Sequence, residues 1–416
     1  MNSFSPFIGT RYNSETVDIQ KVVSPPYDVI SPEQRDAFYE KDERNVIRLE
    51  LNRDSDPYRS AKSFFEDWKK EGALIREAAP VFYVYYQTFV TPTGEQVTRR
   101  GVLGALKVSP YSEGNVLPHE QTLPKAKKDR FALLEATKTQ FSPIFGLIDD
   151  EAEVFDHTID SVTATIPLAD IDEKLPNGET VRHTMWKLTE PALVTRLEKL
   201  IATKRIVIAD GHHRYETAVA FSEAHPDITG ADRIMIYLAN LRAEGTVVLP
   251  THRILHDVSD FNQYTFLATL EKQFEVILCQ SREIGLQLLS EGGFTLIQFP
   301  EPPQWVLVKN KLSAQENDGS SLSKLAVFRL HEQMLKPIAG LTQEQINAKS
   351  NLLYPHTIAE LDEMTAKHEY NAAFILNPVT PDEMLKVTGE GAYMPQKSTY
   401  FYPKLLSGLV FYEFGN

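Results

Sequence analysis

The sequence contains a single cysteine, Cys279, among its 416 residues. One thiol cannot close an intramolecular disulfide or supply a multi-thiolate metal site, so we interpret it as a small buried apolar residue in a reducing compartment. Long hydrophobic runs are also missing, because the most apolar stretches, 81–86 and 206–209, have only strand length. Residues 1–19 lack the basic and apolar segments of a signal peptide. We therefore expect a cytoplasmic protein with no membrane partner.

Positive charge is in short supply as well. The chain has 43 Lys and Arg residues against 57 Asp and Glu residues, a formal net charge of -14. A protein that binds along a nucleic-acid backbone needs a broad basic surface, so we expect no nucleic-acid partner. The basic residues are nevertheless gathered locally, at 125–130, 212–214 and 397–404. Such local clusters are sufficient for a small phosphorylated ligand.

The order of helix and strand patterns favours an α+β fold with a mixed sheet. Helical periodicity marks 58–71, 129–139, 192–204 and 215–224, and strand patterns mark 142–148, 205–210 and 233–241, with a hairpin over 80–108. After a weak boundary near residue 256, helical patterns return at 261–274 and 325–335, and strand patterns at 305–312 and 372–377. We predict two domains, 1–256 and 257–416, in a monomer or homodimer.

The strongest chemical signal is the segment that runs from 206 to 218. An apolar strand ends in Asp210, Gly211 permits a tight turn, and His212, His213 and Arg214 are expected on the loop that leads into a helix. Backbone N–H groups at a helix start, together with His and Arg donors, make an anion site, and phosphate is the expected anion. The alternative is a helix capped by Asp210, with Arg214 paired to Glu216 or another acid. A single glycine excludes the Walker A and dinucleotide patterns.

A second constellation is the pair His119 and Glu120 in a loop ahead of Lys125, Lys127 and Lys128. A His–Glu pair beside a basic cluster suits an acid/base group next to a polyanion. The simpler interpretation of Lys127 and Lys128 is a solvated helix start.

A third constellation lies near the C-terminus, where Lys397, Ser398, Thr399 and Lys404 occur among aromatic residues. Lysines beside hydroxyls suit phosphate oxygens, although an exposed terminal strand would have the same composition.

Near the N-terminus, the rigid Pro-Pro turn before Tyr27 and Asp28 presents these two side chains either to a substrate or only to the turn itself. Elsewhere, His252 and His256 lack a third ligand at a fixed spacing, so a zinc site is not expected and the metal remains unknown. We assign His331 to the polar face of the helix at 325–335.

The order LPHEQT, helix, SPIFGLI and IADGHHRYETA resembles the ParB/sulfiredoxin superfamily over residues 117–220, with an insertion between Leu147 and Ile201. Gly211 and Arg214 match its Gly-x-x-Arg phosphate loop, and the Asp-Gly-His-His-Arg version resembles that of the free serine kinases. Over 24–408, the motifs SPPYDVIS, ADGHHRYETA and KSTYFYPKL resemble a widespread bacterial and archaeal family defined by a domain of unknown function.

The kinase resemblance implies a ParB-like core, elaborated at both ends, that transfers a phosphoryl group to a small metabolite hydroxyl such as that of L-serine, or from O-phosphoserine. Glu120 would take the hydroxyl proton, with His119 beside it, and Asp210 would assist at the acceptor or hold Mg2+. Residues 211–214 would cradle the phosphoryl group of ATP, ADP or pyrophosphate, and the last segment could return Lys397 and Lys404 to the site. Two alternatives are a ParB-like phosphate- or nucleotide-binding regulator without turnover and a phosphoserine phosphatase.

Overall fold

The computed structural model describes residues 2–120, 124–175, 178–311 and 319–415, and only the backbone at 124–126. Contacts within the chain divide it into two compact units. The first unit comprises Met1–Pro118, Thr122–Val247 and Pro403–Asn416, and the second comprises His119–Gln121 and Val248–Tyr402.

The predicted α+β class with a mixed sheet is confirmed. Whether 1–256 and 257–416 are independent domains stays a prediction. No helix among the described residues is long and apolar enough to cross a membrane.

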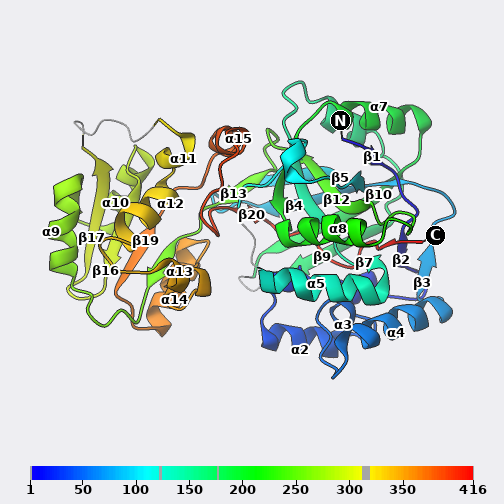
Figure 1. Ribbon diagram of the computed structural model, residues 1–416, viewed down its shortest axis with the longest axis horizontal. Coiled ribbons are helices and arrows are strands. Elements are labelled where there is room, and N and C mark those ends of the chain that lie inside the picture. Colours follow the sequence, from blue (N-terminus) through cyan, green and yellow to red (C-terminus); the bar gives the residue numbers. More distant parts are fainter. Residues whose placement is uncertain (1, 121–123, 176–177, 312–318, 416) are drawn as a thin grey trace. The chain divides into compact units, whose positions relative to one another are not determined.

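The described residues of the first unit form a nine-stranded mixed sheet (Figure 1). The strand order is β6-β11-β8-β12-β5-β4-β10-β9, with β1 paired to β5. β8 runs parallel to β12 and antiparallel to β11. The strands are β1 (Phe4–Ser5), β4 (Phe82–Val90), β5 (Gln96–Lys107), β6 (Val116–Leu117), β8 (Ile144–Ile148), β9 (Ala169–Lys174), β10 (Thr180–Leu188), β11 (Ile206–Asp210) and β12 (Arg233–Asn240).

Helices pack on this sheet through apolar faces that the sequence periodicity predicts. In α4 the Asp56 side chain caps the first turn, and Ala61, Phe65 and Trp68 repeat at helical spacing and are buried, but this face packs against α3 and α5 rather than on the sheet. α5 and α8 lie side by side (Figure 1). The helices of the first unit are α1 (Ile19–Val22), the 3-10 turn η1 (Tyr27–Val29), α2 (Pro32–Lys41), α3 (Ile47–Glu50), α4 (Pro57–Lys70), the 3-10 turn η2 (Tyr111–Glu113), α5 (Pro124–Thr137), α6 (Val154–Asp160), α7 (Pro191–Ala202) and α8 (His212–Ala224).

Two features place the distant segments of the chain on this sheet. The insertion between Leu147 and Ile201 supplies α6, α7 and the hairpin of β9 and β10, which extends the sheet beyond β4. The C-terminal segment returns to the first unit, where β21 (Tyr412–Glu413) pairs with β7 (Thr139–Gln140). A further small ladder joins β2 (Thr10–Tyr12) to β3 (Leu74–Arg76).

The second unit contains a six-stranded antiparallel sheet in the order β15-β17-β16-β19-β14-β18. Its strands are β14 (Arg253–Leu255), β15 (Phe274–Cys279), β16 (Thr295–Phe299), β17 (Gln304–Asn310), β18 (Leu352–Leu353) and β19 (Ala372–Ile375), besides the short β13 (Val247–Leu249) and β20 (Tyr400–Tyr402). Its helices are α9 (Gln263–Gln273), α10 (Arg282–Ser290), α11 (Ser321–Lys324), α12 (Ala326–Arg329), the π-helical turn η3 (Leu330–Leu335), α13 (Gln343–Ala348), α14 (Ile358–Lys367) and α15 (Pro381–Gly389).

Several sequence expectations are corrected in detail. The helices predicted from 129 and 215 begin earlier, at Pro124 and His212. The helix predicted over 325–335 is a short α-helix followed by a π-helical turn, and His331 is only 3% exposed. Its assignment to a polar face was therefore wrong. The sequence patterns also missed β15 and β16, whose apolar residues alternate too irregularly to be separated from neighbouring helix patterns.

Candidate functional site

The first candidate site begins where β11 ends and α8 begins. Four residues of β11 are buried, and Asp210 at its end is partly exposed. Gly211 adopts a left-handed conformation with φ of 92° and is the residue that precedes the first turn of α8. Gly211 is the N-cap residue of α8, and Asp210 precedes it by one position. The segment therefore presents a carboxylate next to the N-terminus of a 13-residue helix.

The Asp210 carboxylate forms ion pairs with two cationic side chains. One carboxylate oxygen accepts a hydrogen bond from Arg214 Nη2 at 3.2 Å, and the other accepts one from Lys404 Nζ, also at 3.2 Å. The three side chains are 22%, 11% and 15% exposed, respectively, so the group is largely screened from solvent. Two cationic side chains therefore meet at one carboxylate, and both are donors of the kind that bind phosphate oxygens.

Arg214 is fixed in position by more than this ion pair. Its Nη1 donates to Ser142 Oγ at 3.0 Å and to the Pro143 carbonyl at 2.7 Å, both in the segment that leads into β8. Glu216, the other acid considered as its partner, instead pairs with Lys127 at 2.8 Å. The guanidinium is thus held between the β11–α8 loop and the start of β8, with its plane oriented before any ligand binds.

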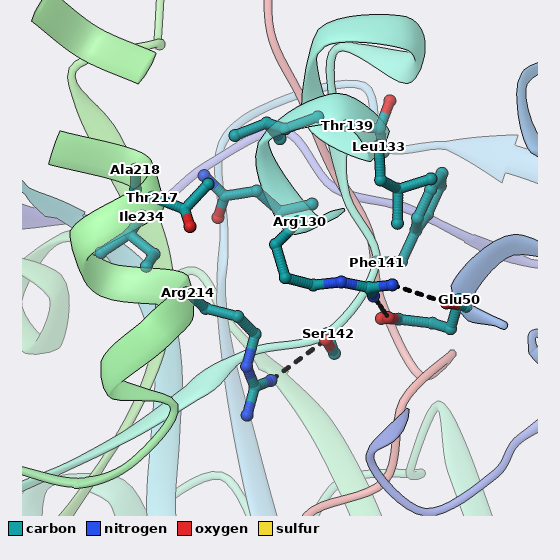
Figure 2. A pocket seen from close by; sticks show the side chains of 12 residues that line it. Glu50, Arg130, Leu133, Thr139, Phe141, Ser142, Arg214, Thr217, Ala218 and Ile234 are labelled. Atoms are coloured by element: carbon teal, nitrogen blue, oxygen red, sulfur yellow. Dashed lines mark hydrogen bonds and ion pairs between the residues drawn. The ribbon is translucent and has the colours of Figure 1, made fainter. Parts of the chain in front are cut away.

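A small pocket of about 50 Å3 adjoins Arg214 and is shown in Figure 2. Arg130 from α5 and Arg214 from α8 both line this pocket, and in Figure 2 the Arg130 guanidinium lies against the Glu50 carboxylate and that of Arg214 against Ser142. Arg130 Nη1 donates to Glu50 Oε2 at 2.8 Å, and the ring of Tyr27 lies 4.0 Å from the Arg130 guanidinium carbon. A volume of this size accommodates only a few water molecules or one small group.

Tyr27 therefore lies at the candidate site, with its ring 5.9 Å from the Arg214 guanidinium as well. Burial raises the pKa of Tyr27 to about 12, although the charges of Arg214 and Arg130 oppose this rise. The phenol thus stays protonated and can donate a hydrogen bond. Asp28 follows it in η1 and is exposed. His212 is 3% exposed and His213 is partly exposed. The predicted Lys125 side chain lies outside the described residues.

The remaining predicted residues form a separate set in the second unit. The His119 carbonyl accepts a hydrogen bond from the Met394 amide at 2.8 Å, and the His119 Nε2 atom lies 2.9 Å from the Thr399 hydroxyl. Glu120 Oε2 accepts a hydrogen bond from the Lys397 amide at 3.3 Å. The KST segment, residues 397–399, therefore contacts the His119–Glu120 loop.

A buried arginine, Arg253, donates hydrogen bonds to backbone carbonyls at the start of the KST segment. Arg253, which begins β14, is fully buried, and its Nη2 donates to the Lys397 carbonyl at 2.9 Å and the Gln396 carbonyl at 3.2 Å. Lys397 has a positive φ of 59°, which these contacts help to maintain. Ser398 is also buried and donates to the Pro395 carbonyl. The Ser398 hydroxyl thus stabilises the turn.

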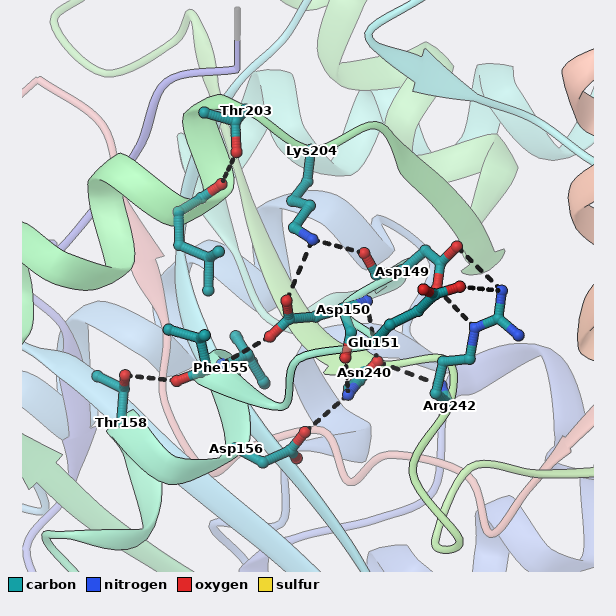
Figure 3. Close-up of polar contacts among 12 residues, drawn as sticks. Asp149, Asp150, Glu151, Phe155, Asp156, Thr158, Thr203, Lys204, Asn240 and Arg242 are labelled. Carbon is teal, nitrogen blue, oxygen red and sulfur yellow. Dashed lines mark hydrogen bonds and ion pairs between the residues drawn. The ribbon is translucent and has the colours of Figure 1, made fainter.

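The acidic side chains that follow β8 make structural contacts within the first unit, as Figure 3 shows. Lys204 Nζ donates to the Asp149 carbonyl at 2.7 Å and to Asp150 Oδ1 at 3.1 Å. The Asn240 amide donates to the Asp150 carbonyl and to Asp156 Oδ2. Burial raises the pKa of Asp156. These contacts join the ends of β8 and β12 to α6, and the described residues hold no group of three or more His, Cys, Asp or Glu suited to a metal ion.

Sequence reasoning included Arg130 only as a member of the basic cluster 125–130, and it did not single out Glu50 or Ser142. One signal was present, because Arg130 lies on the same face of α5 as Leu133 and Leu134, where a charged residue is out of place. Glu50 and Ser142 carry no comparable signal, since their polar partners are distant in sequence.

Gly211→Ala is expected to destabilise the protein by about 2 kcal/mol or more. The substitution forces a left-handed conformation on alanine, and its Cβ would lie 2.7 Å from Ile144 Cγ2 and 3.1 Å from the Arg214 guanidinium. Gly94→Ala is the matched control, because Gly94 has a similar φ of 88° and open space around it. Thermal unfolding of both variants measures the difference, and equal melting temperatures would contradict the close packing at Gly211.

Comparison with known proteins gives a family match and several weak structural likenesses. A family model described as "Protein of unknown function (DUF1015)" matches residues 4–333. No curated protein matches the sequence.

Similar solved structures include a conserved hypothetical protein from Pyrococcus furiosus, which is 14% identical with a TM-score of 0.37 over 71% of this chain and 93% of that chain. A free serine kinase variant in complex with ADP is 13% identical with a TM-score of 0.38, over 71% and 90%. SbnI with a C-terminal truncation from Staphylococcus aureus is 12% identical with a TM-score of 0.34, over 73% and 85%. TM-scores this low carry no function from one protein to another.

Proposed function

This chain belongs to the DUF1015 family of proteins of unknown function, and we propose that it transfers a phosphoryl group to the hydroxyl of a small metabolite. Free L-serine is the proposed acceptor, O-phosphoserine the product, and ATP, ADP or pyrophosphate the donor. The reverse reaction is included, because the same groups stabilise the transferred phosphoryl in both directions.

The observation that carries the proposal is the pair of cations held at Asp210. Arg214 and Lys404 converge on one carboxylate at the start of α8, where backbone N–H groups also favour an anion. Phosphoryl transfer needs mainly positioning and charge neutralisation, and cationic clamps of this kind supply both. A phosphoryl oxygen that shares the two cations with Asp210 would be neutralised without any movement of the backbone.

The remaining residues receive roles that experiments can test one by one. The proposed phosphate loop consists of Gly211, His212, His213 and Arg214. Tyr27 is proposed to donate a hydrogen bond from its phenol hydroxyl to the substrate. Glu120 is proposed to take the hydroxyl proton, with His119 beside it. Lys397, Ser398 and Thr399 stay proposed phosphate ligands, and Asp28 and Lys125 proposed substrate ligands.

A magnesium ion fits this site only in part. Asp210 supplies one carboxylate, and Mg2+ in nucleotide sites is typically held by one or two carboxylates together with phosphate oxygens and water. Asp210 would therefore be the protein ligand, and Mg2+ would neutralise charge on the phosphoryl donor.

The direct test is product formation by the purified full chain. We expect O-phosphoserine when L-serine, Mg2+ and ATP, ADP or pyrophosphate are supplied in turn, detected by phosphorus NMR and mass spectrometry. The reverse assay supplies O-phosphoserine with AMP, ADP or phosphate and measures free serine. Absence of product in every forward and reverse assay would overturn the proposal.

The alternatives predict different results in the same assays. A phosphoserine phosphatase would release serine and phosphate from O-phosphoserine with no acceptor present. A phosphate- or nucleotide-binding regulator would bind pyrophosphate or ATP, as measured by calorimetry, and form no product.

A further inference from the structure

A second pocket in the first unit has no part in the proposed phosphoryl transfer. It has a volume of about 460 Å3 and lies between α2 and β9. This volume is within the range of small-molecule sites, which combine a mainly apolar lining with a few polar groups. The apolar lining comes from Val23, Pro25, Phe38, Ile171 and Leu406.

Charged side chains of both signs line this pocket, namely Lys41, Asp172, Glu173 and Lys174. Glu173 and Lys41 are the pair considered as ligand contacts. The Glu173 side chain is 17% exposed, and its Oε2 lies 3.1 Å from His183 Nε2. Lys41 at the end of α2 makes no ion pair with the described residues. Burial lowers the pKa of Lys41, and the charges of Glu173 and Asp18 act against this shift. The pocket therefore offers a carboxylate and an ammonium group beside an apolar wall.

A buried chain of polar groups leads from Glu173 into the core. His183 is 1% exposed, and its Nδ1 lies 2.6 Å from the Tyr85 hydroxyl. The Tyr85 hydroxyl in turn accepts a hydrogen bond from the Leu406 amide at 3.4 Å. Leu406 itself lines the pocket, so the pocket contacts the C-terminal segment both directly and through this chain.

The C-terminal segment that contains Leu406 also carries Lys404, whose side chain pairs with Asp210 in the candidate phosphate site. Gln87 Nε2 donates to the Lys404 carbonyl at 2.8 Å, and Lys404 Nζ donates to Asp210. Arg99, which is fully buried, donates to the Pro403 carbonyl and to Gln87 Oε1. Residues 403–406 are thus fixed by buried polar contacts between the pocket and Asp210.

We propose that this pocket is a second ligand site, which takes an α-amino acid with an apolar side chain and whose occupancy is transmitted to Lys404. Lys41 would bind the ligand carboxylate, Glu173 would bind its ammonium group, and Phe38 and Ile171 would contact its side chain. The ligand is identified by these complementary charges and by the apolar lining. The inference does not rest on the proposed function, because binding is measured without turnover.

Calorimetric titration of the full chain with L-leucine, L-methionine and L-phenylalanine, each alone, tests the site. We expect at least one of them to bind, and the corresponding amine and the corresponding carboxylic acid, each lacking one charge, to bind at least tenfold more weakly. Failure of all three amino acids to bind would overturn the proposal, as would equal binding of the singly charged analogues.

Two variants locate the binding. Glu173→Gln and Lys41→Met are each expected to weaken binding at least tenfold, whereas Glu95→Gln, at an exposed turn, should leave it unchanged. Lys41 is exposed, so its variant should fold even if Glu173→Gln does not. Unchanged affinity in the Lys41→Met variant would place the ligand elsewhere.

Hydrogen exchange measures the transmission to Lys404. When the amino acid binds, peptides that contain residues 404–407 are expected to exchange severalfold more slowly, because the Leu406 and Ser407 amides are held by Tyr85 and Ser24. Exchange that is unchanged on binding would remove the proposed link.

Discussion

A Glu120→Gln variant is expected to form O-phosphoserine about a thousandfold more slowly than the unchanged protein while binding pyrophosphate equally well. Glutamine keeps an oxygen that can accept the hydrogen bond from the Lys397 amide, so the contact between the Glu120 loop and the KST segment should survive. What disappears is the negative charge that would take the proton of the acceptor hydroxyl. Initial rates and calorimetric titration with pyrophosphate measure the two properties.

Arg214→Gln is expected to weaken pyrophosphate binding, which Glu120→Gln should leave unchanged. It removes a guanidinium that contacts Asp210, Ser142 and the Pro143 carbonyl, so pyrophosphate binding should weaken along with turnover. Glu369→Gln, an exposed position of the second unit, is the control for both variants. If Glu120→Gln retained full turnover, Glu120 would not be the base.

Glu50→Gln is expected to lower the free energy of unfolding by about 3–5 kcal/mol. The side chains of Glu50 and Arg130 are only 4% and 8% exposed, so removing one charge leaves the other buried without its main partner. Burial by itself lowers the pKa of Arg130, but the charges of Glu50, Tyr27 and Asp129 outweigh it and raise the pKa. Arg130 therefore stays charged in the unchanged protein, and Glu50→Gln removes the largest of the charges that raise its pKa.

Thermal or urea unfolding measures this loss, which corresponds to a decrease of roughly 5 °C in melting temperature. Asp170→Asn is the matched control, because it breaks the exposed Asp170–Arg182 pair, in which the side chains are 38% and 59% exposed. An exposed pair contributes about 0–1 kcal/mol, so this control should change stability little. Equal unfolding of the two variants would show that the buried pair contributes no more than the exposed one.

Tyr27 links this stability to the candidate site. Its ring contacts Arg130 at 4.0 Å and lies 5.9 Å from Arg214, so the buried pair supports the turn that carries a proposed substrate ligand. A Glu50 variant that folds would therefore also be expected to position Tyr27 less well. The N-terminal Pro-Pro turn thus belongs structurally to the first unit, close to the β11–α8 loop.

Local sequence patterns predicted the elements around the site well. The strand at 205–210 and the helix that follows it were both expected, because an apolar run and a helical stripe are properties of neighbouring residues. Patterns of this kind were less informative in the second unit. There α10, α13, α14 and α15 were not predicted, although each begins after a Ser or Thr whose side chain caps its first turn.

The sequence by itself determined the turn at Gly211, because a tight connection between a strand and a helix requires a backbone conformation that glycine adopts freely. It also determined which charges were available near that turn. Only the tertiary structure decided their partners: Lys404 reaches Asp210 from 194 residues away, and Arg130 reaches Glu50 from 80. The reason is physical, since ion pairs and burial depend on distance in space, and the sheet brings together segments that are far apart along the chain.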